Sequence, residues 1–288
     1  MQTADELRRV LGQFGIWMPP PARTGLDSEE YAREIEAAGF TSAWFPGMNS
    51  VGDLRSVEPM LAATDRLVLG TGIASVWTWT PADLAREANR LATAYPGRFI
   101  LGLGVSHAPG VEATGQAYVK PYSKMVQFLD ELPAVTAPVV LAALGPKMLQ
   151  LAATRARGAH PYLVTPDHTR RAREVLGRGP LLLPEQTVLL TDDADQARAV
   201  GTDWLRAYLA LPNYANNLLR SGFTENDLDS VSDRLFDAIV AWGDEDAIVR
   251  RVDEHKQAGA DHVCVQVLTA DPREFPREHW RRLAGALL

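Results

Sequence analysis

Strand-like and helix-like segments alternate along almost the whole chain, and a glycine-rich or polar stretch follows nearly every strand-like segment. Alternation of this kind predicts a parallel sheet covered by helices. The repeats predict an α/β fold, a (β/α)8 TIM barrel, whose site is built across the strand ends. The segments typical of buried strands are 13–18, 42–45, 67–71, 99–103, 139–142, 160–164, 187–190 and 262–268.

The stretch from Asp193 to Gly243 holds more helical sequence than one crossover between strands needs. It contains LPNYANNLL and FTENDLDSVSDRLFDAIVAW, and it predicts a helical insertion before strand eight that would cover the site or form an interface. A length of 288 residues with 46% hydrophobic content allows one domain or two. The unbroken alternation favours a single domain over 1–288.

Charge and cysteine usage narrow the class of partner. A net charge of -7 without a block of like charge argues against nucleic acid and favours a small-molecule substrate. The opening residues MQTADELRRV do not read as a secretion signal and no apolar run reaches the length of a membrane span, so we expect a cytoplasmic protein without a membrane partner. The single cysteine, Cys264, is expected to be a core thiol. The sequence leaves open whether the chain forms a homodimer.

Two predicted strand ends carry glycines, in LVLGTGIASVWTWTP (67–81) and FILGLGVSHAP (99–109). From residue types alone, an ordinary strand end explains Gly72-Ile73, and the Gly-x-Gly at Gly102 to Gly104 is a weak signal for phosphate binding. His107 could act as an acid or base there, or it could be a structural loop histidine; residue types do not separate the two.

Aromatic residues and helix starts also fall at the predicted strand ends. The rings of Trp17, Trp77, Trp79 and Tyr162 would give a planar cofactor and an apolar substrate flat walls. The segment 164–168 opens a helix that could face a phosphate, with Asp167 as a candidate cap, and a second helix opens at Gly145. No spacing among the six histidines indicates a metal site.

Several motifs together carry a family resemblance that covers nearly the whole chain. GTGIA, YPGRFILGLGVSHAP, VKPYSKM and LAALGPKMLQLAA match the bacterial luciferase-like superfamily in order and spacing. YPGRF, GAHPYLVTPDHT, LPNYANNLLRSGF and GADHVCVQVL are most similar to an actinobacterial subfamily within the branch that uses the deazaflavin coenzyme F420.

The resemblance implies a site at the strand ends. Gly72 and Ile73 would form a bulge with a non-prolyl cis peptide bond that supports the central ring of the deazaflavin. His107 occupies the place where related dehydrogenases hold a carboxylate suggested to donate a proton. The rest of the implied cofactor site comprises Ala74, Gly104, Val105, Ser106, Gly145, Val164, Thr165 and His168. The implied substrate pocket comprises Trp17, Met48, Asn49, Trp77 and Tyr162.

The chain departs from better-known relatives after strand two. Sugar-phosphate and alcohol dehydrogenases of the family carry an Asp or His pair there, whereas this chain reads Pro46-Gly47-Met48-Asn49, so those activities are not expected. Few lysines and no evident basic pair at the barrel mouth argue against a phosphorylated substrate.

Three functions compete at this point. The first is a coenzyme F420-dependent oxidoreductase, which transfers a hydride between the deazaflavin and a small apolar organic substrate. The second is an FMN-dependent luciferase-like monooxygenase, and the third is a non-catalytic protein that binds a deazaflavin or flavin. The fold alone does not decide among them.

Overall fold

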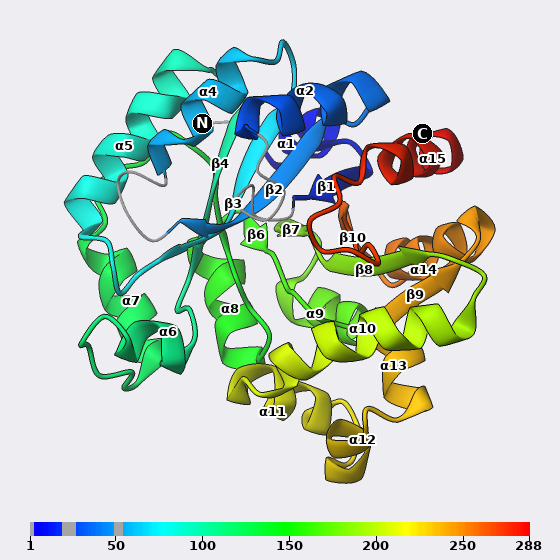
Figure 1. Ribbon diagram of the computed structural model, residues 1–288. Helices are drawn as coiled ribbons and strands as arrows, with labels where there is room; N and C mark the ends of the chain where they lie inside the picture. The colour runs from blue at the N-terminus through cyan, green and yellow to red at the C-terminus, as the bar shows by residue number, and fades with distance from the viewer. Residues whose placement is uncertain (1–2, 19–26, 49–53) are drawn as a thin grey trace.

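Ten parallel strands form one curled sheet in the computed structural model, which describes residues 3–18, 27–48 and 54–288 (Figure 1). Their order in the sheet is β7-β6-β5-β4-β3-β2-β1-β10-β8-β9. The strands are β1 (Phe14–Trp17), β2 (Ser42–Met48), β3 (Val68–Ser75), β4 (Phe99–Gly104), β5 (Val139–Leu141), β6 (Gly158–Ala159), β7 (Leu181–Leu182), β8 (Glu185–Leu190), β9 (Val240–Gly243) and β10 (Val263–Val267).

A short segment between β7 and β8 closes the curled sheet. β7 leads into β8 through Leu183 and Pro184. The Leu183 N–H donates to the Ala159 carbonyl beside β6 (2.9 Å), and the Cys264 N–H of β10 donates to the Pro184 carbonyl (2.9 Å). The sheet therefore has the barrel-like form that the alternating sequence predicts.

Helices surround this sheet, with α4, α5, α7 and α8 on one side of the view and α14 and α15 on the other (Figure 1). Most of them follow a strand directly, as parallel pairing requires. Their bounds are α1 (Ala4–Leu11), α2 (Ser28–Ala38), α4 (Val57–Ala62), α5 (Pro81–Ala94), α6 (Ala108–Glu112), α7 (Pro121–Glu131), α8 (Pro146–Arg155), α9 (Pro166–Leu176), α10 (Ala194–Leu209), α11 (Pro212–Arg220), α12 (Glu225–Ser230), α13 (Asp233–Ile239), α14 (Glu245–Gln257) and α15 (Arg277–Leu287).

Successive residues along the strands belong to two different cores. Ile16 and Leu101 lie in a cluster shared with the surrounding helices, whereas their neighbours Trp17 and Ile100 lie in a second cluster that includes Trp44. Because side chains alternate between the faces of a strand, one set points toward the helices and the other toward the barrel interior. The interior therefore contains large aromatic rings rather than aliphatic layers alone.

The first helix packs against the barrel interior. Leu7 and Leu11 of α1 are 0% and 1% exposed and belong to the same cluster as Trp44. Arg8 Nε donates to Asp261 Oδ1 (2.7 Å), and the other oxygen of this carboxylate accepts from Arg173 of α9 (2.6 Å). Asp261 thus ties α1 and α9 to the turn that precedes β10.

The sequence-based bounds of three strands were wrong. β3 was expected at 67–71 but continues to Ser75. β2 was expected to break at Pro46-Gly47 but continues to Met48. Beyond Trp44, among the described residues, it pairs only with β3. Its other side is, within that part of the chain, an unpaired edge there, and an edge strand tolerates a proline. β6 was expected at 160–164 but ends at Ala159, because Pro161 lacks an N–H and Leu163 has a positive φ of 57°.

The chain between β8 and β10 is helical over α10 to α13, but the expected helix through Trp242 ends earlier. α13 stops at Ile239, and residues Val240–Gly243 form β9, which pairs with β8. Valine and tryptophan favour a strand when a sheet edge is available, so tertiary pairing overrides the helical reading here.

Candidate active site

The C-terminal ends of β3 and β4 form the centre of the candidate site. The peptide bond between Gly72 and Ile73 is cis, and the pairing of β3 with β4 shifts register between Gly70 and Ala74, so the expected bulge and cis bond are confirmed. A Cβ on Gly72 would lie 2.2 Å from the Trp17 ring. Glycine therefore lets the indole lie directly against this bond.

Neighbouring residues on these strands take different roles. A Cβ on Gly104 would lie 2.5 Å from Ile73 Cγ1, so the end of β4 fits closely against the Ile73 side chain. Ala74 is fully buried in the core between sheet and helices, which leaves only its backbone for a ligand. The Val105 carbonyl accepts from Trp77 Nε1 (2.8 Å), and Ser106 has a positive φ of 54°.

His107 lies at the end of this loop, directly before α6. Its Nδ1 is 3.1 Å from Asn213 Oδ1 of α11, and its ring centroid is 5.2 Å from that of Tyr214. An amide oxygen can only accept, so Nδ1 carries the proton in this pairing and Nε2 keeps its lone pair. Burial lowers the pKa of His107 while the Asn213 hydrogen bond partly opposes this shift, so the neutral ring is favoured near pH 7.

A chain of hydroxyl groups lines the interior beside Trp17. Tyr162 Oη lies 2.7 Å from Gln266 Oε1 and 2.9 Å from Tyr208 Oη, and its ring centroid is 5.0 Å from that of Trp17. Because the amide oxygen can only accept, Tyr208 donates to Tyr162 and Tyr162 donates to Gln266. Burial raises the pKa of Tyr162 well above its ordinary value, so its hydroxyl keeps its proton at neutral pH.

The sequence did not identify the residues that α10 and α11 bring to this place. Tyr208, Asn213 and Tyr214 contact Tyr162 or His107, although they are distant in sequence. The available signal was the aromatic and amide content of LPNYANNLL in a stretch already expected to cover the site. Local periodicity does not indicate which strand end such a helix approaches.

A buried carboxyl group lies deeper in the interior. Glu185 is 1% exposed and accepts hydrogen bonds from the Leu163 N–H (3.1 Å) and the Thr187 hydroxyl. Burial raises the pKa of Glu185 to about 7, against the effect of these two hydrogen bonds. A substantial fraction of this group is therefore protonated at neutral pH.

Cys264 is the core thiol that the sequence predicts, and His160 is a second buried polar residue of the interior. His160 is 1% exposed, its Nδ1–H donates to the Leu183 carbonyl (2.6 Å), and its ring stacks on Trp44 (4.5 Å). Cys264 is fully buried, and burial raises the pKa of its thiol well above the ordinary value. Both are structural in this position.

The helix starts after β5 and the β6 region differ from expectation in one respect. Thr165, not Asp167, caps α9, since its Oγ1 accepts from the His168 N–H (3.2 Å), and Asp167 instead pairs with Arg170. Val164 is buried, at 2% exposed. Gly145 precedes α8, whose N-terminus has no side-chain cap.

Not all expected pocket residues come together. Trp17 and Tyr162 are in contact, but Trp77 lies beside Tyr118 (ring centroids 5.4 Å apart) and packs against the core between sheet and helices. Trp79 is buried in the core between sheet and helices. Met48 ends β2 but its side chain is not described, and Asn49 lies outside the described residues.

Two cavities among the described residues flank α9. One, of about 420 Å³, lies toward α13 and α14, and the other, of about 340 Å³, lies toward α8 and α11. Within the ranges that the structure describes, no group of His, Cys, Asp and Glu is arranged to hold a metal ion. A helix long and apolar enough to cross a membrane is likewise absent from the described part of the chain.

Known proteins resemble this chain over nearly its full length. A Mycobacterium tuberculosis protein whose provisional name is coenzyme F420-dependent oxidoreductase is 24% identical, over 92% of this chain and 96% of its own. An F420-dependent secondary alcohol dehydrogenase, solved with an F420-acetone adduct, has a TM-score of 0.67 at 17% identity, covering 96% of this chain and 98% of its own.

A flavin enzyme shares the fold equally well. The oxygenating constituent of 3,6-diketocamphane monooxygenase from Pseudomonas putida, solved with FMN, has a TM-score of 0.67 at 15% identity, covering 94% of this chain and 95% of its own. The family model for luciferase-like monooxygenases matches residues 13–137 and 129–262. The chain therefore belongs to the luciferase-like monooxygenase family.

Proposed function

We propose that the chain is a coenzyme F420-dependent oxidoreductase that transfers a hydride between the deazaflavin and a small, apolar organic substrate. The observation that carries the proposal is the close packing at the ends of β3 and β4, where the Trp17 ring lies against Gly72 and the Ile73 side chain lies against Gly104. The F420-dependent relatives support this choice of cofactor at the level of the family.

The residues present fit a planar cofactor. A Cβ would find no room at Gly72 or Gly104, because the Trp17 ring and the Ile73 side chain lie against these residues, so the ends of β3 and β4 carry no side chain of their own at these two positions. The backbone of Gly72, Ile73 and Gly104 to Ser106 would hold the ring. Gly145, Thr165 and His168 lie at two helix starts, which favour anionic groups such as a cofactor phosphate.

The bound cofactor would supply the hydride-accepting or hydride-donating carbon, and the protein would supply orientation and a proton. His107 is neutral near pH 7 and its Nε2 carries the lone pair, so it would accept a proton from a substrate hydroxyl as a general base. In the opposite direction the protonated ring would return that proton. Tyr162 and Tyr208 would exclude water from one side of the pocket and present an apolar wall.

Parallel fluorescence titrations with oxidised coenzyme F420 and with FMN test the proposal. We expect F420 to bind more tightly. Tighter binding of FMN would instead favour an FMN-dependent luciferase-like monooxygenase, for which the FMN-bound structural neighbour is the supporting observation. Tight F420 binding without turnover across aldehydes, ketones, imines and activated alkenes would favour a non-catalytic cofactor-binding protein.

A pair of glycine substitutions tests the position of the ring. Gly104→Ala would force Ile73 to move by placing a Cβ 2.5 Å from its Cγ1, so we expect weaker F420 binding. Gly110→Ala is the matched control, because its Cβ would meet only Ser106 Oγ, at 4.0 Å. Equal dissociation constants for the two folded variants would contradict the proposed position.

A further inference from the structure

The cavity between the start of α8, α9 and α11 differs in charge from its neighbour across α9. Arg171 of α9 and Arg220 of α11 line it, together with one acidic side chain, Glu174. Among the described residues neither arginine forms an ion pair; Arg171 donates to Ser221 Oγ (2.9 Å) and Arg220 to Asn217 Oδ1 (3.4 Å). We call this cavity the α8–α9–α11 pocket.

The arginines of the neighbouring cavity are already neutralised. Arg170 pairs with Asp167, Arg234 with Asp227, and Arg251 with Glu254. Two guanidinium groups against one carboxylate leave a positive charge in the α8–α9–α11 pocket. The sequence-based expectation that this end of the barrel has no basic pair is therefore wrong, because the pair comes from two different helices.

Two buried polar side chains also line the pocket. Asn217 is 3% exposed, and no hydrogen bond from its Nδ2 is present among the described residues. His168 is 4% exposed; its Nε2–H donates to the Leu144 carbonyl (2.8 Å), and its Nδ1 has no partner within the described residues. Buried polar groups normally find partners, so the unpartnered Nδ1 of His168 in this cavity wall points to a ligand.

The start of α8 adds to the positive field at the same place. No side chain caps this helix, and Pro146 in its first turn lines the pocket. A Cβ on Gly145 would lie 3.8 Å from Arg220 Nη2, so the guanidinium lies beside the helix start. Free N–H groups and the helix dipole both favour an anion there.

We propose that the α8–α9–α11 pocket binds an oxyanion, a phosphate or a carboxylate, held by Arg220 and Arg171 with Asn217 as an amide donor. Under the proposed function, on which this part rests, the acidic side chain of coenzyme F420 is the source of that group. Free phosphate has the same chemistry and is the other source.

The pKa of His168 reports whether an anion is bound in the α8–α9–α11 pocket. Burial, and then the charges of Arg171 and Arg220, lower the pKa of His168 to about 4. A bound oxyanion offsets those two charges, so it raises this pKa. A pH titration of the His168 imidazole by NMR, with and without inorganic pyrophosphate, measures the change without any turnover.

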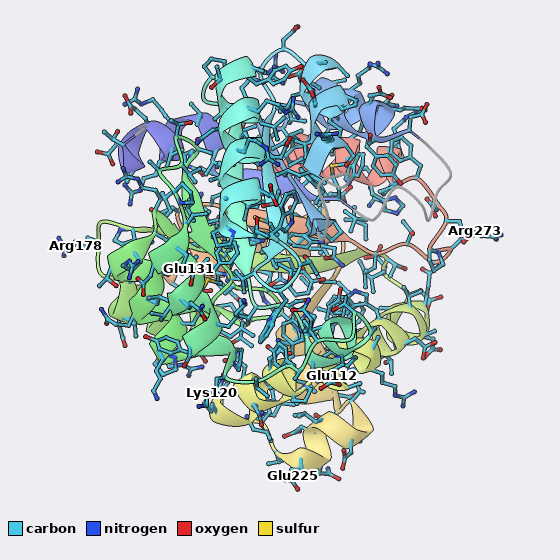
Figure 2. All side chains as sticks on the ribbon, turned by 90° about the vertical axis from the view of Figure 1, so that its left-hand side faces the viewer. Glu112, Lys120, Glu131, Arg178, Glu225 and Arg273 are labelled. Atoms are coloured by element: carbon cyan, nitrogen blue, oxygen red, sulfur yellow. The ribbon has the colours of Figure 1, made fainter. Side chains whose placement is uncertain are left out.

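Binding assays on matched variants identify the source. Arg220→Gln is expected to weaken pyrophosphate binding by about 10- to 100-fold, the loss of one charge-assisted hydrogen bond. Arg178→Gln removes the same charge from an exposed side chain that points away from the molecule (Figure 2), and it should leave binding near wild type. Equal binding by both variants, with no change in the pKa of His168, overturns the proposal.

A second set of binding assays compares the dissociation constant of F420 with that of its riboside fragment, which lacks the phosphate and glutamate groups. We expect Arg220→Gln to weaken F420 binding and to leave fragment binding unchanged. An equal effect on both ligands overturns the assignment of the pocket to the acidic side chain. If neither ligand binds but pyrophosphate binding still depends on Arg220, the proposed function fails and the anion site stands with free phosphate as its ligand.

Discussion

Glu185 should make the stability of this protein depend on pH, and Glu185→Gln isolates that dependence. Burial raises the pKa of its carboxyl from an ordinary 4.5 to about 7. An acid with a raised folded-state pKa stabilises the fold fully below the unfolded pKa, and this contribution is lost as pH rises through the folded pKa. Between pH 5 and pH 8 the lost free energy of unfolding amounts to about 2–3 kcal/mol.

Buried histidines act in the opposite direction, so the wild-type curve alone does not reveal Glu185. Burial lowers the pKa of His160, His168 and His262 from 6.5 to about 4, and that of His255 to about 3. Their stabilising contribution is present above about pH 6.5 and is lost as pH falls toward these values. Both proteins contain these histidines, so their contribution cancels when the free energy of unfolding of the variant is compared with that of the wild type at each pH.

The assay is urea unfolding of wild type and Glu185→Gln at several pH values from 5 to 8. The amide loses one of the two acceptors used by Leu163 and Thr187, which costs about 1 kcal/mol at every pH. On top of this offset, the variant should gain about 2–3 kcal/mol on wild type as pH rises. Glu112→Gln controls for the loss of one exposed charge, and a pH-independent difference for Glu185→Gln refutes the reasoning.

Three further substitutions test the candidate site. Gly72→Ala places a Cβ 2.2 Å from the Trp17 ring and should lower the free energy of unfolding by about 1–3 kcal/mol. Gly179→Ala, with nothing within 4 Å of its Cβ, should leave this free energy unchanged. Equal free energies of unfolding for the two variants would contradict the position of the indole against Gly72. His107→Ala should lower turnover by about 10²–10⁴-fold with unchanged cofactor affinity, and near-normal turnover across the pH range removes it from the chemistry. Tyr162→Phe leaves a buried amide oxygen without its donor and should cost about 1–3 kcal/mol in urea unfolding; wild-type stability would contradict the hydroxyl chain.

Local signals predicted much of the fold. The sequence itself carries the signals for some helix ends: Pro81 opens α5, and Gly39 ends α2 as a left-handed cap. The prediction was wrong where the signal was ambiguous: 240–243 was expected to be helical but is a strand, because β8 offers it an edge to pair with. Pairing of this kind depends on distant residues that a local pattern does not contain.

The sequence likewise predicted one part of the candidate site and missed another. The cis bond at Gly72-Ile73 followed from a family resemblance, and the placement of His107 after β4 followed from strand order. The partners of these residues did not follow, because Asn213 and the tyrosines come from helices whose approach is decided by tertiary packing. The basic pair of the α8–α9–α11 pocket was missed for the same reason.

The ion pair between Arg8 and Asp261 has a consequence for folding during synthesis, because its two residues are made at different times. The two residues are separated by 253 positions in the chain, so the helix that packs into the barrel interior is made long before its anchoring carboxylate. At about 5–20 residues per second, α1 waits about 10–50 s on the ribosome for this partner. Its apolar face, Leu7 and Leu11, is unprotected by the barrel during that interval. Newly made chains should therefore be exposed to aggregation or chaperone capture through this helix before the barrel closes.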